Sequence, residues 1–224
     1  MRRLTATQLF GPLNAAEVKN APRELYCQGD VCLVREPRVA IVGSRAAGGE
    51  AIRRAMRLSR ELSRVGVVVV SGLAAGIDTA AHRAAIEARG RTIAVLGNAL
   101  SIFFPAENRE LQLAIGKDHL LISEFPEDAA PEAANFPARN RTMALLSQAT
   151  VIVDALERSG TVAQAWEAIR LGRPLFLMRS LVEERGLEWT KAVMEYGAEV
   201  LDSTDQVLAR LTLKGGLDIA DAPS

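Results

Sequence analysis

Short runs of aliphatic and β-branched residues recur between residues 39 and 201, and they constrain the fold more than any other feature of the sequence. The seven runs are 39–43, 67–71, 92–97, 120–123, 150–155, 174–178 and 198–201. They do not alternate between apolar and polar residues, as strands with one solvated face do. The runs therefore predict strands that are buried on both faces of a parallel sheet.

Segments with the periodicity of helices separate these runs. They cover residues 49–65, 78–89, 107–115, 139–148, 161–171, 187–196 and 204–211. Strands that alternate with helices indicate an α/β fold with a doubly wound, mostly parallel sheet and helices on both faces. We expect this domain to span residues 38–212.

The two ends of the chain show weaker patterns. Residues 1–37 predict an N-terminal extension, helical or irregular over 1–22, with a short hairpin formed by LYCQGDVCLV (25–34). A two-residue loop in that hairpin would place Cys27 and Cys32 opposite each other. In a reducing compartment we expect free thiols there. Residues 213–224 are expected to form a flexible tail.

The charges balance, with 27 basic and 27 acidic residues. A protein that coats nucleic acid along its whole surface is usually basic, so any such site must be a local patch. The arginines 53, 57, 60 and 64 follow one helix face. Such a basic stripe could track a polyanion, but a solvated surface helix shows the same pattern and is the favoured interpretation. We expect a cytoplasmic protein without a membrane partner, because no apolar run approaches the roughly 20 residues of a membrane span and the basic N-terminus lacks a signal-peptide core.

Four strand-to-helix turns contain residues that suit a phosphate-bearing ligand, and in an open parallel sheet ligands bind beyond the carboxyl ends of the strands. The turns contribute glycines, hydroxyls and arginines: Gly43, Ser44 and Arg45; Ser71, Gly72 and Gly76; Arg139, Asn140 and Arg141; and Ser159, Gly160 and Thr161. Helix N-termini at these turns add N–H groups for an anion. No Walker A or dinucleotide-binding glycine motif is present, which disfavours an NTPase or a dinucleotide enzyme.

Asp78 and His82 lie four residues apart and therefore share a helix face. Asp78 could accept hydrogen bonds from N–H groups near the helix start, or the pair could act as metal ligands or as an acid and a base. No third ligand is evident, so we expect no metal site. His82 could instead orient a loop or contact a ligand oxygen.

In order, VAIVGSR, SGLAAGIDTAAH, TIAVLG, FFPAENREL, LISEFP, FPARNR and the SGT turn resemble the motifs of the DprA/Smf family (DNA-processing protein A) over roughly residues 25–178. The resemblance implies a Rossmann-like domain that binds single-stranded DNA and hands it to a RecA-type recombinase during natural transformation. Such proteins often form homodimers and use neither a catalytic reaction nor a cofactor. The implied site comprises Gly43, Ser44, Arg45, Ser71, Gly72, Gly76, Asp78, His82, Arg139, Asn140, Arg141, Ser159 and Gly160, with Ser71 bonded to a phosphate for which Gly72 and Gly76 clear space.

The sequence departs from the family pattern at several of these turns. Ala75 stands where the family usually has Arg, Asn98 begins a turn that usually contains glycine, and Asp154 replaces Glu. Met178-Arg179 replace a common Pro-Gly turn. We also expect the family's C-terminal winged helix to be absent and its N-terminal helical domain to be at most a remnant in residues 1–24.

RSGTVAQ (158–164) also resembles the Gly-Gly-x-Gly-Thr-x-x-Glu turn of the LOG and lysine-decarboxylase-like enzymes. Those enzymes cleave the base from nucleoside monophosphates. Gln164 occupies the position of their catalytic Glu and cannot act as a carboxylate base, although Glu167 lies one helical turn away. The favoured hypothesis is thus a DNA-binding protein without enzymatic activity. The alternative is a nucleotide-binding sensor or a LOG-like phosphoribohydrolase.

Overall fold

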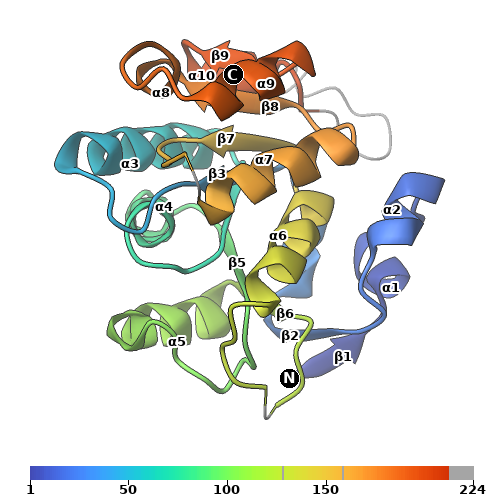
Figure 1. Ribbon diagram of the computed structural model, residues 1–224. Coiled ribbons are helices and arrows are strands. Elements are labelled where there is room, and N and C mark those ends of the chain that lie inside the picture. Colours follow the sequence, from blue (N-terminus) through green and yellow to red (C-terminus); the bar gives the residue numbers. More distant parts are fainter. Residues whose placement is uncertain (128, 158, 212–224) are drawn as a thin grey trace.

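The computed structural model describes residues 1–127, 129–157 and 159–211, and in this part nine strands form one sheet (Figure 1). The strands are β1 (Arg2–Leu4), β2 (Leu25–Gly29), β3 (Arg38–Val42), β4 (Val68–Ser71), β5 (Thr92–Leu96), β6 (Leu120–Ser123), β7 (Ala149–Ile152), β8 (Leu175–Met178) and β9 (Glu199–Leu201). Their spatial order is β1-β2-β6-β5-β4-β3-β7-β8-β9. Strands β3 to β9 are parallel, whereas β1 and β2 run antiparallel to their neighbours.

Helices cover both faces of this sheet. They are α1 (Ala6–Phe10), α2 (Ala15–Asn20), α3 (Gly49–Arg64), α4 (Ile77–Glu87), α5 (Arg109–Asp118), α6 (Asn135–Leu146), α7 (Gly160–Arg170), α8 (Arg179–Glu183), α9 (Glu188–Glu195) and α10 (Thr204–Leu208), with 3₁₀ helices at Val31–Arg35 and Ala106–Asn108. Figure 1 shows α3, α4 and α5 on one side of the sheet and α6 with α1 and α2 on the other.

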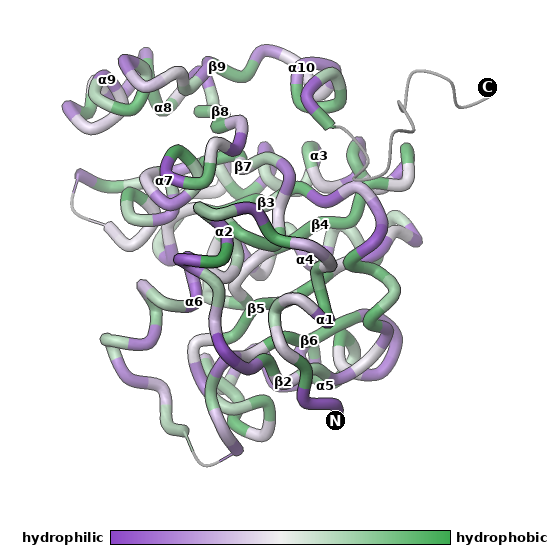
Figure 2. The backbone as a smooth tube through the Cα atoms, turned by 90° about the vertical axis from the view of Figure 1, so that its right-hand side faces the viewer, coloured by the Kyte–Doolittle hydropathy of each residue, from purple (hydrophilic) through white to green (hydrophobic). Residues whose placement is uncertain are grey.

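Alternate residues of β3 show why the sheet needs both layers. Val39 and Ile41 pack with apolar residues of α3 and α4, whereas Ala40 and Val42 pack with residues of α6 and α7. All four side chains are buried. The central strands are accordingly hydrophobic along their length in Figure 2. The predicted α/β fold with a doubly wound, mostly parallel sheet is thereby confirmed.

The predicted hairpin at residues 25–34 is wrong. Strand β2 pairs with β1 and with β6, and the chain then enters the 3₁₀ helix Val31–Arg35. Asp30 starts this helix, because its carboxylate accepts a hydrogen bond from the N–H of Cys32 at 3.0 Å. Cys27 is buried in the sheet and Cys32 is exposed, and both are free thiols. Burial raises the pKa of the Cys27 thiol to about 11.

The expected tail at 213–224 lies outside the described residues. Within the described ranges, no helix combines the length and the apolar character that crossing a membrane requires.

Candidate functional site

A pocket of about 340 Å³ opens at the carboxyl ends of β3, β4 and β7. Its lining consists of Val42, Gly43, Ser44, Arg45, Ala74, Asp78, Phe136, Arg139, Asn140, Met143, Leu156, Ser159, Gly160, Thr161 and Gln164. Nine of the fourteen residues expected at the site are in this list. The other five, which are Ser71, Gly72, Gly76, His82 and Arg141, do not line this pocket. The strand-end location therefore agrees with the sequence, whereas the residue set needs correction.

A second hollow of about 70 Å³ adjoins the pocket, and both are lined by Arg45, Ala74 and Phe136. The exposed Arg45 guanidinium lies 4.9 Å from the centre of the Phe136 ring. The rings of Phe136 and the exposed Phe104 have centroids 6.0 Å apart. Arg45 and Phe136 thus form a cationic and aromatic wall shared by the two hollows. Phe104 and Phe136 were not expected at the site, although each lies in a quoted motif beside proline.

Asp78 and Arg139 form a buried network under this wall. The Asp78 carboxylate accepts hydrogen bonds from the N–H groups of Gly72 and Ala74 at 3.2 and 3.3 Å. Arg139 donates to the carbonyl oxygens of Gly72 and Val95 at 2.7 and 3.3 Å. Burial raises the pKa of Asp78, although the nearby Arg139 charge opposes that rise. Burial likewise lowers the pKa of Arg139. Through these hydrogen bonds, both side chains hold the turns in place.

Two glycines of the second turn face protein atoms rather than open space. A Cβ on Gly72 would lie 1.5 Å from Nη1 of Arg139. A Cβ on Gly76 would lie 2.4 Å from the carbonyl oxygen of Ser44, and Gly76 also has a φ of +76°. The expectation that these glycines clear space for a phosphate is corrected at their Cβ positions, because Arg139 and the first turn fill that space, although Gly72 still lines the smaller hollow.

Ser71 and His82 are fully buried, and neither lines the pocket. The Ser71 hydroxyl donates to the carbonyl oxygen of Ile41 at 2.7 Å instead of to a phosphate. His82 Nδ1 lies 2.6 Å from Oγ1 of Thr92, which itself donates to the carbonyl oxygen of Val69. Thr92 Oγ1 must then accept from His82, which assigns the proton of the neutral ring to Nδ1. Burial lowers the pKa of His82 to about 3, and the charges of His119 and Arg139 add to that shift.

Helix α7 presents its N-terminus to the pocket through Gly160 and Thr161. Ser159 precedes the helix, and no side chain caps this end. Asn140 Nδ2 donates to the carbonyl oxygen of Gly160 at 3.0 Å and so fixes α7 against α6. An open helix N-terminus beside Arg45 suits an anionic group.

Arg141 lies beside Glu167 instead of lining the pocket. Its Nε lies 3.8 Å from a carboxylate oxygen of Glu167, which also accepts from Arg170 at 2.7 Å. Of the three arginines expected to contact phosphate, Arg45 is the exposed one that lines the pocket. No cluster of three or more His, Cys, Asp or Glu residues that could hold a metal occurs in the described part of the chain.

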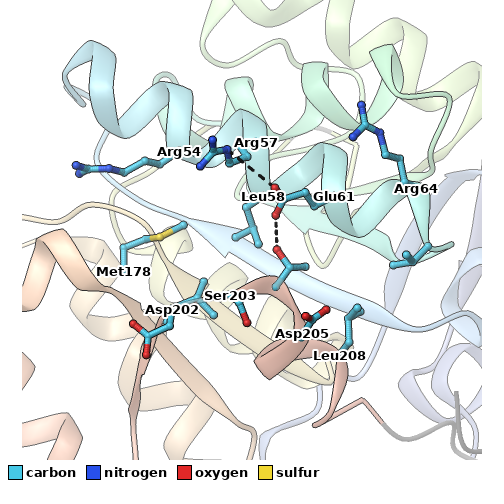
Figure 3. A pocket seen from close by; sticks show the side chains of 13 residues that line it. Arg54, Arg57, Leu58, Glu61, Arg64, Met178, Asp202, Ser203, Asp205 and Leu208 are labelled. Atoms are coloured by element: carbon cyan, nitrogen blue, oxygen red, sulfur yellow. Dashed lines mark hydrogen bonds and ion pairs between the residues drawn. The ribbon is translucent and has the colours of Figure 1, made fainter. Parts of the chain in front are cut away.

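A larger hollow of about 660 Å³ lies between α3 and the segment around α10 (Figure 3). Its charged lining is mixed, with Arg54, Arg57, Glu61 and Arg64 on α3 and with Asp202 and Asp205 in the opposite segment. Arg57 Nε lies 4.0 Å from Glu61, and Thr204 donates to the same carboxylate. The α3 arginines thus have carboxylates as neighbours, so this surface is not a continuous basic track.

The fold and the pocket define a Rossmann-like α/β protein with a cationic, aromatic-walled pocket at the carboxyl ends of its strands. The family model of DNA recombination-mediator protein A matches residues 4–212. The chain belongs to this family, and the resemblance read from its motifs is confirmed.

Individual relatives support this assignment. The chain is 37% identical over 198 residues to DNA processing protein DprA of Streptococcus pneumoniae, covering 88% of this chain and 70% of that protein. It is 39% identical over 175 residues to Protein Smf of Synechocystis, covering 78% of this chain and 44% of that protein. The chain therefore spans less than half of that second relative.

Solved structures agree with the family assignment. The crystal structure of DprA from Streptococcus pneumoniae matches with a TM-score of 0.80 and 32% identity, covering 94% of this chain and 74% of that chain. DNA processing protein A from Helicobacter pylori, whose structure addresses its single-stranded DNA binding mode, matches with a TM-score of 0.78 and 29% identity, covering 92% and 94%. The molybdenum cofactor carrier protein of Chlamydomonas reinhardtii shares the fold at 20% identity, a TM-score of 0.53 and coverage of 76% and 92%.

Proposed function

We propose that this protein binds single-stranded DNA along the two adjoining hollows and presents it to a RecA-type recombinase, as in natural transformation. The observation that carries the proposal is the stacking of Arg45 on Phe136 between the hollows. Single-strand binders combine cations for the backbone with aromatic faces on which bases stack. Arg45 and Phe136 provide both at one point.

Neighbouring groups extend this surface in a consistent way. Phe104 continues the aromatic face from Phe136, and Arg109 lies 5.0 Å from the centre of the Phe103 ring. The N-terminus of α7 offers N–H groups on the other side of Arg45. A strand that follows these features would meet both cations and rings, and such a local patch suits a protein with no net charge.

We propose binding without catalysis and without a cofactor. The side chain expected to act in a phosphoribohydrolase, Glu167, is not among the pocket residues and is paired with Arg170. The carboxylate that does line the pocket, Asp78, is buried and already accepts two backbone hydrogen bonds. A cytoplasmic location and a homodimer are part of the same proposal, and both rest on the family assignment.

The ligand is tested with labelled deoxythymidine oligonucleotides of increasing length at two salt concentrations, with mononucleotides in parallel. Affinity should rise with length, because each further phosphate contact releases counterions. Arg45→Ala should weaken binding and reduce the salt slope by about one unit, whereas Arg57→Ala on α3 should change neither. Equal affinity for a mononucleotide and a long strand would favour the nucleotide sensor instead.

The recombinase step needs its own measurement. The rate at which a RecA-type recombinase assembles on single-stranded DNA should increase when this protein is bound first. An Arg45→Ala variant should give less of that increase at equal protein concentration. An unchanged assembly rate with the unmodified protein would contradict the recombinase part of the proposal while leaving DNA binding intact.

A further inference from the structure

Helices α3, α4, α7 and α9 end in the same backbone motif, and α4 differs from the other three in one residue. In each, the N–H groups of the second and third residues after the helix donate to carbonyl oxygens of its last turns. The second of these residues is in the left-handed conformation. It is Gly66, Gly172 or Gly197 after α3, α7 and α9, with φ of +81°, +64° and +92°. After α4 it is Arg89, with φ of +59°, a conformation that favours glycine.

The packing of the α4 turn does not explain an arginine at this position. The next residue is Gly90, where a Cβ would lie 2.4 Å from the Cβ of Ser63, so close contact with the end of α3 requires glycine there. Arg89 itself is exposed, and its side chain has no ion pair or hydrogen bond in the described part of the chain. An unfavourable backbone conformation that serves no internal contact is typical of a functional position.

Other exposed cations lie on the adjoining turns. Arg64 is in the last turn of α3, Arg91 precedes β5, and Lys117 is in the last turn of α5. Because β4, β5 and β6 are neighbours in the sheet, the turns at their amino ends form a row about 10 Å long. Burial lowers the pKa of His119 and the Arg91 charge adds to that shift, so Arg91 lies near the end of α5. We call Arg64, Arg89, Arg91 and Lys117 the basic edge.

The carboxylates of this region do not neutralise the basic edge. Glu87 lies 2.9 Å from Arg60 and is compensated by it. Asp118 follows Lys117, and Asp30 is held next to the end of α5, where its N–H donates to the carbonyl oxygen of His119 at 2.7 Å. The four cations of the basic edge therefore outnumber the two remaining carboxylates, and the row keeps a positive charge.

The composition of the basic edge fits a phosphate backbone. The planar guanidinium of arginine binds phosphate oxygens in pairs. A DNA duplex carries one charge per about 1.7 Å of its axis, so a row of about 10 Å faces about six charges. A protein partner would bury an aromatic or apolar centre. Of the exposed large apolar residues in the described part of the chain, Val65 is the one in these turns, which favours nucleic acid over an acidic protein.

We propose that the basic edge is a second nucleic-acid surface, which holds the phosphate backbone of a duplex without reading its bases. It lies at the amino ends of strands four or five residues long, about 15 Å from the carboxyl ends that form the pocket. None of its four side chains is aromatic, so it suits a duplex whose bases are already paired and stacked. This inference goes beyond the proposed function, because it adds a ligand that the pocket does not hold.

The test measures the binding of a labelled duplex of about 20 base pairs and of a labelled thymidine oligonucleotide at several salt concentrations. The double variant Arg89→Gly/Arg91→Ala should bind the duplex about tenfold or more weakly at low salt, with a salt slope smaller by about two units. Its affinity for the single strand should fall by less. Arg57→Ala/Arg210→Ala is the charge-matched control, since both arginines are exposed and each faces a carboxylate, and it should keep the duplex affinity.

Thermal unfolding separates a binding role of Arg89 from a role in folding. Arg89→Gly should leave Tm unchanged or raise it while duplex affinity falls. Gly66→Arg makes the reciprocal change on the neighbouring turn, where a Cβ would meet no atom within 4 Å, so Tm should fall while duplex affinity rises. Gly172→Arg is its control, because Gly172 has the same geometry but precedes β8, which β3 and β7 separate from β4. It should lower Tm without the gain in affinity.

The outcomes separate this inference from the proposed function. No duplex binding, duplex binding unchanged in the double variant, or a lowered Tm in Arg89→Gly overturns the inference and leaves single-strand binding standing. An equal loss of duplex binding in Arg45→Ala would place the duplex in the pocket and also overturn it. Binding of polyglutamate instead of the duplex, dependent on Arg89 and Arg91, would overturn it in favour of an acidic protein. Duplex binding at the basic edge without single-strand binding would contradict the proposed function alone.

Discussion

Replacing Gly72 by alanine tests whether the glycine of the second turn serves the protein interior or the ligand. The new Cβ would lie 1.5 Å from Nη1 and 2.4 Å from Cζ of Arg139, so the guanidinium must move. Arg139 is 6% exposed and cannot move into solvent without disturbing the turn. The displacement would break its hydrogen bonds to Gly72 and Val95.

The magnitude follows from those bonds. Hydrogen bonds to a charged group contribute about 1.5–3 kcal/mol each, and breaking a buried ionic network costs about 3–5 kcal/mol. We therefore expect Gly72→Ala to lower the free energy of unfolding by about 4 kcal/mol. With a urea m value of about 2–3 kcal/mol/M, the midpoint should fall by about 1.3–2 M.

Gly160→Ala is the matched control for this substitution. Gly160 is the first residue of α7, and a Cβ there would meet no atom within 4 Å. Alanine should reduce the entropy of the unfolded chain. The free energy of unfolding should therefore stay unchanged or rise by up to about 1 kcal/mol. Urea unfolding followed by circular dichroism measures both. A Gly72→Ala protein as stable as the control would refute the internal role of Gly72 and restore the expectation of space for a ligand.

Two further predictions concern charge. Ala75 lines the smaller hollow beside Arg45, so Ala75→Arg should add a charge-assisted contact to a phosphate. Affinity for single-stranded DNA should rise about tenfold at low salt and by less at high salt. An affinity unchanged across a salt titration would contradict this. The pKa of His82 is about 3 in the folded protein and about 6.5 in the unfolded chain. On acidification the unfolded chain therefore takes up the proton first, and the free energy of unfolding should fall below pH 6.5. The loss should reach about 2.7 kcal/mol at pH 4.5. Urea midpoints across this range should drop more for the unmodified protein than for His82→Asn, and parallel curves would show that His82 does not carry the effect.

The predicted elements that proved right were those with a strong local signal. All seven apolar runs from residue 39 onward contain strands of the sheet, because burial on both faces leaves a continuous apolar run in the sequence. Strand β2 was misassigned because its partners come from distant segments. Tyr26 pairs with Arg3 on one side and with Ser123 on the other, and no local pattern reports such pairing.

The start of α6 shows a second limit of local reasoning. The sequence predicted a helix from residue 139 onward, after Pro137. The helix instead begins at Asn135, because proline is tolerated in the first turn, where its missing N–H is not needed. This shift carries Phe136 onto the helix and places it beside Arg45.

Side-chain direction explains why part of the site was assigned to the wrong partners. The sequence placed Arg45, Arg139 and Arg141 at one edge of the sheet, and of the three Arg45 and Arg139 line the pocket there. Arg45 is exposed above Phe136, Arg139 turns inward to Gly72, and Arg141 turns toward Glu167. Three arginines that the sequence assigned to one site thus take three roles, which spacing alone cannot separate.

The buried residues of the motifs give these turns a fixed geometry, and that geometry sets the positions of the exposed residues. Asp78 ties the second turn to the start of α4, and Arg139 joins that turn to α6 and to the end of β5. Because both side chains are enclosed and bonded, ligand binding would not have to order them. What remains available at the edge is Arg45, Phe136 and the start of α7. A substitution of Asp78 or Arg139 should therefore lower the stability of the protein, and a substitution of Arg45 or Phe136 should weaken ligand binding.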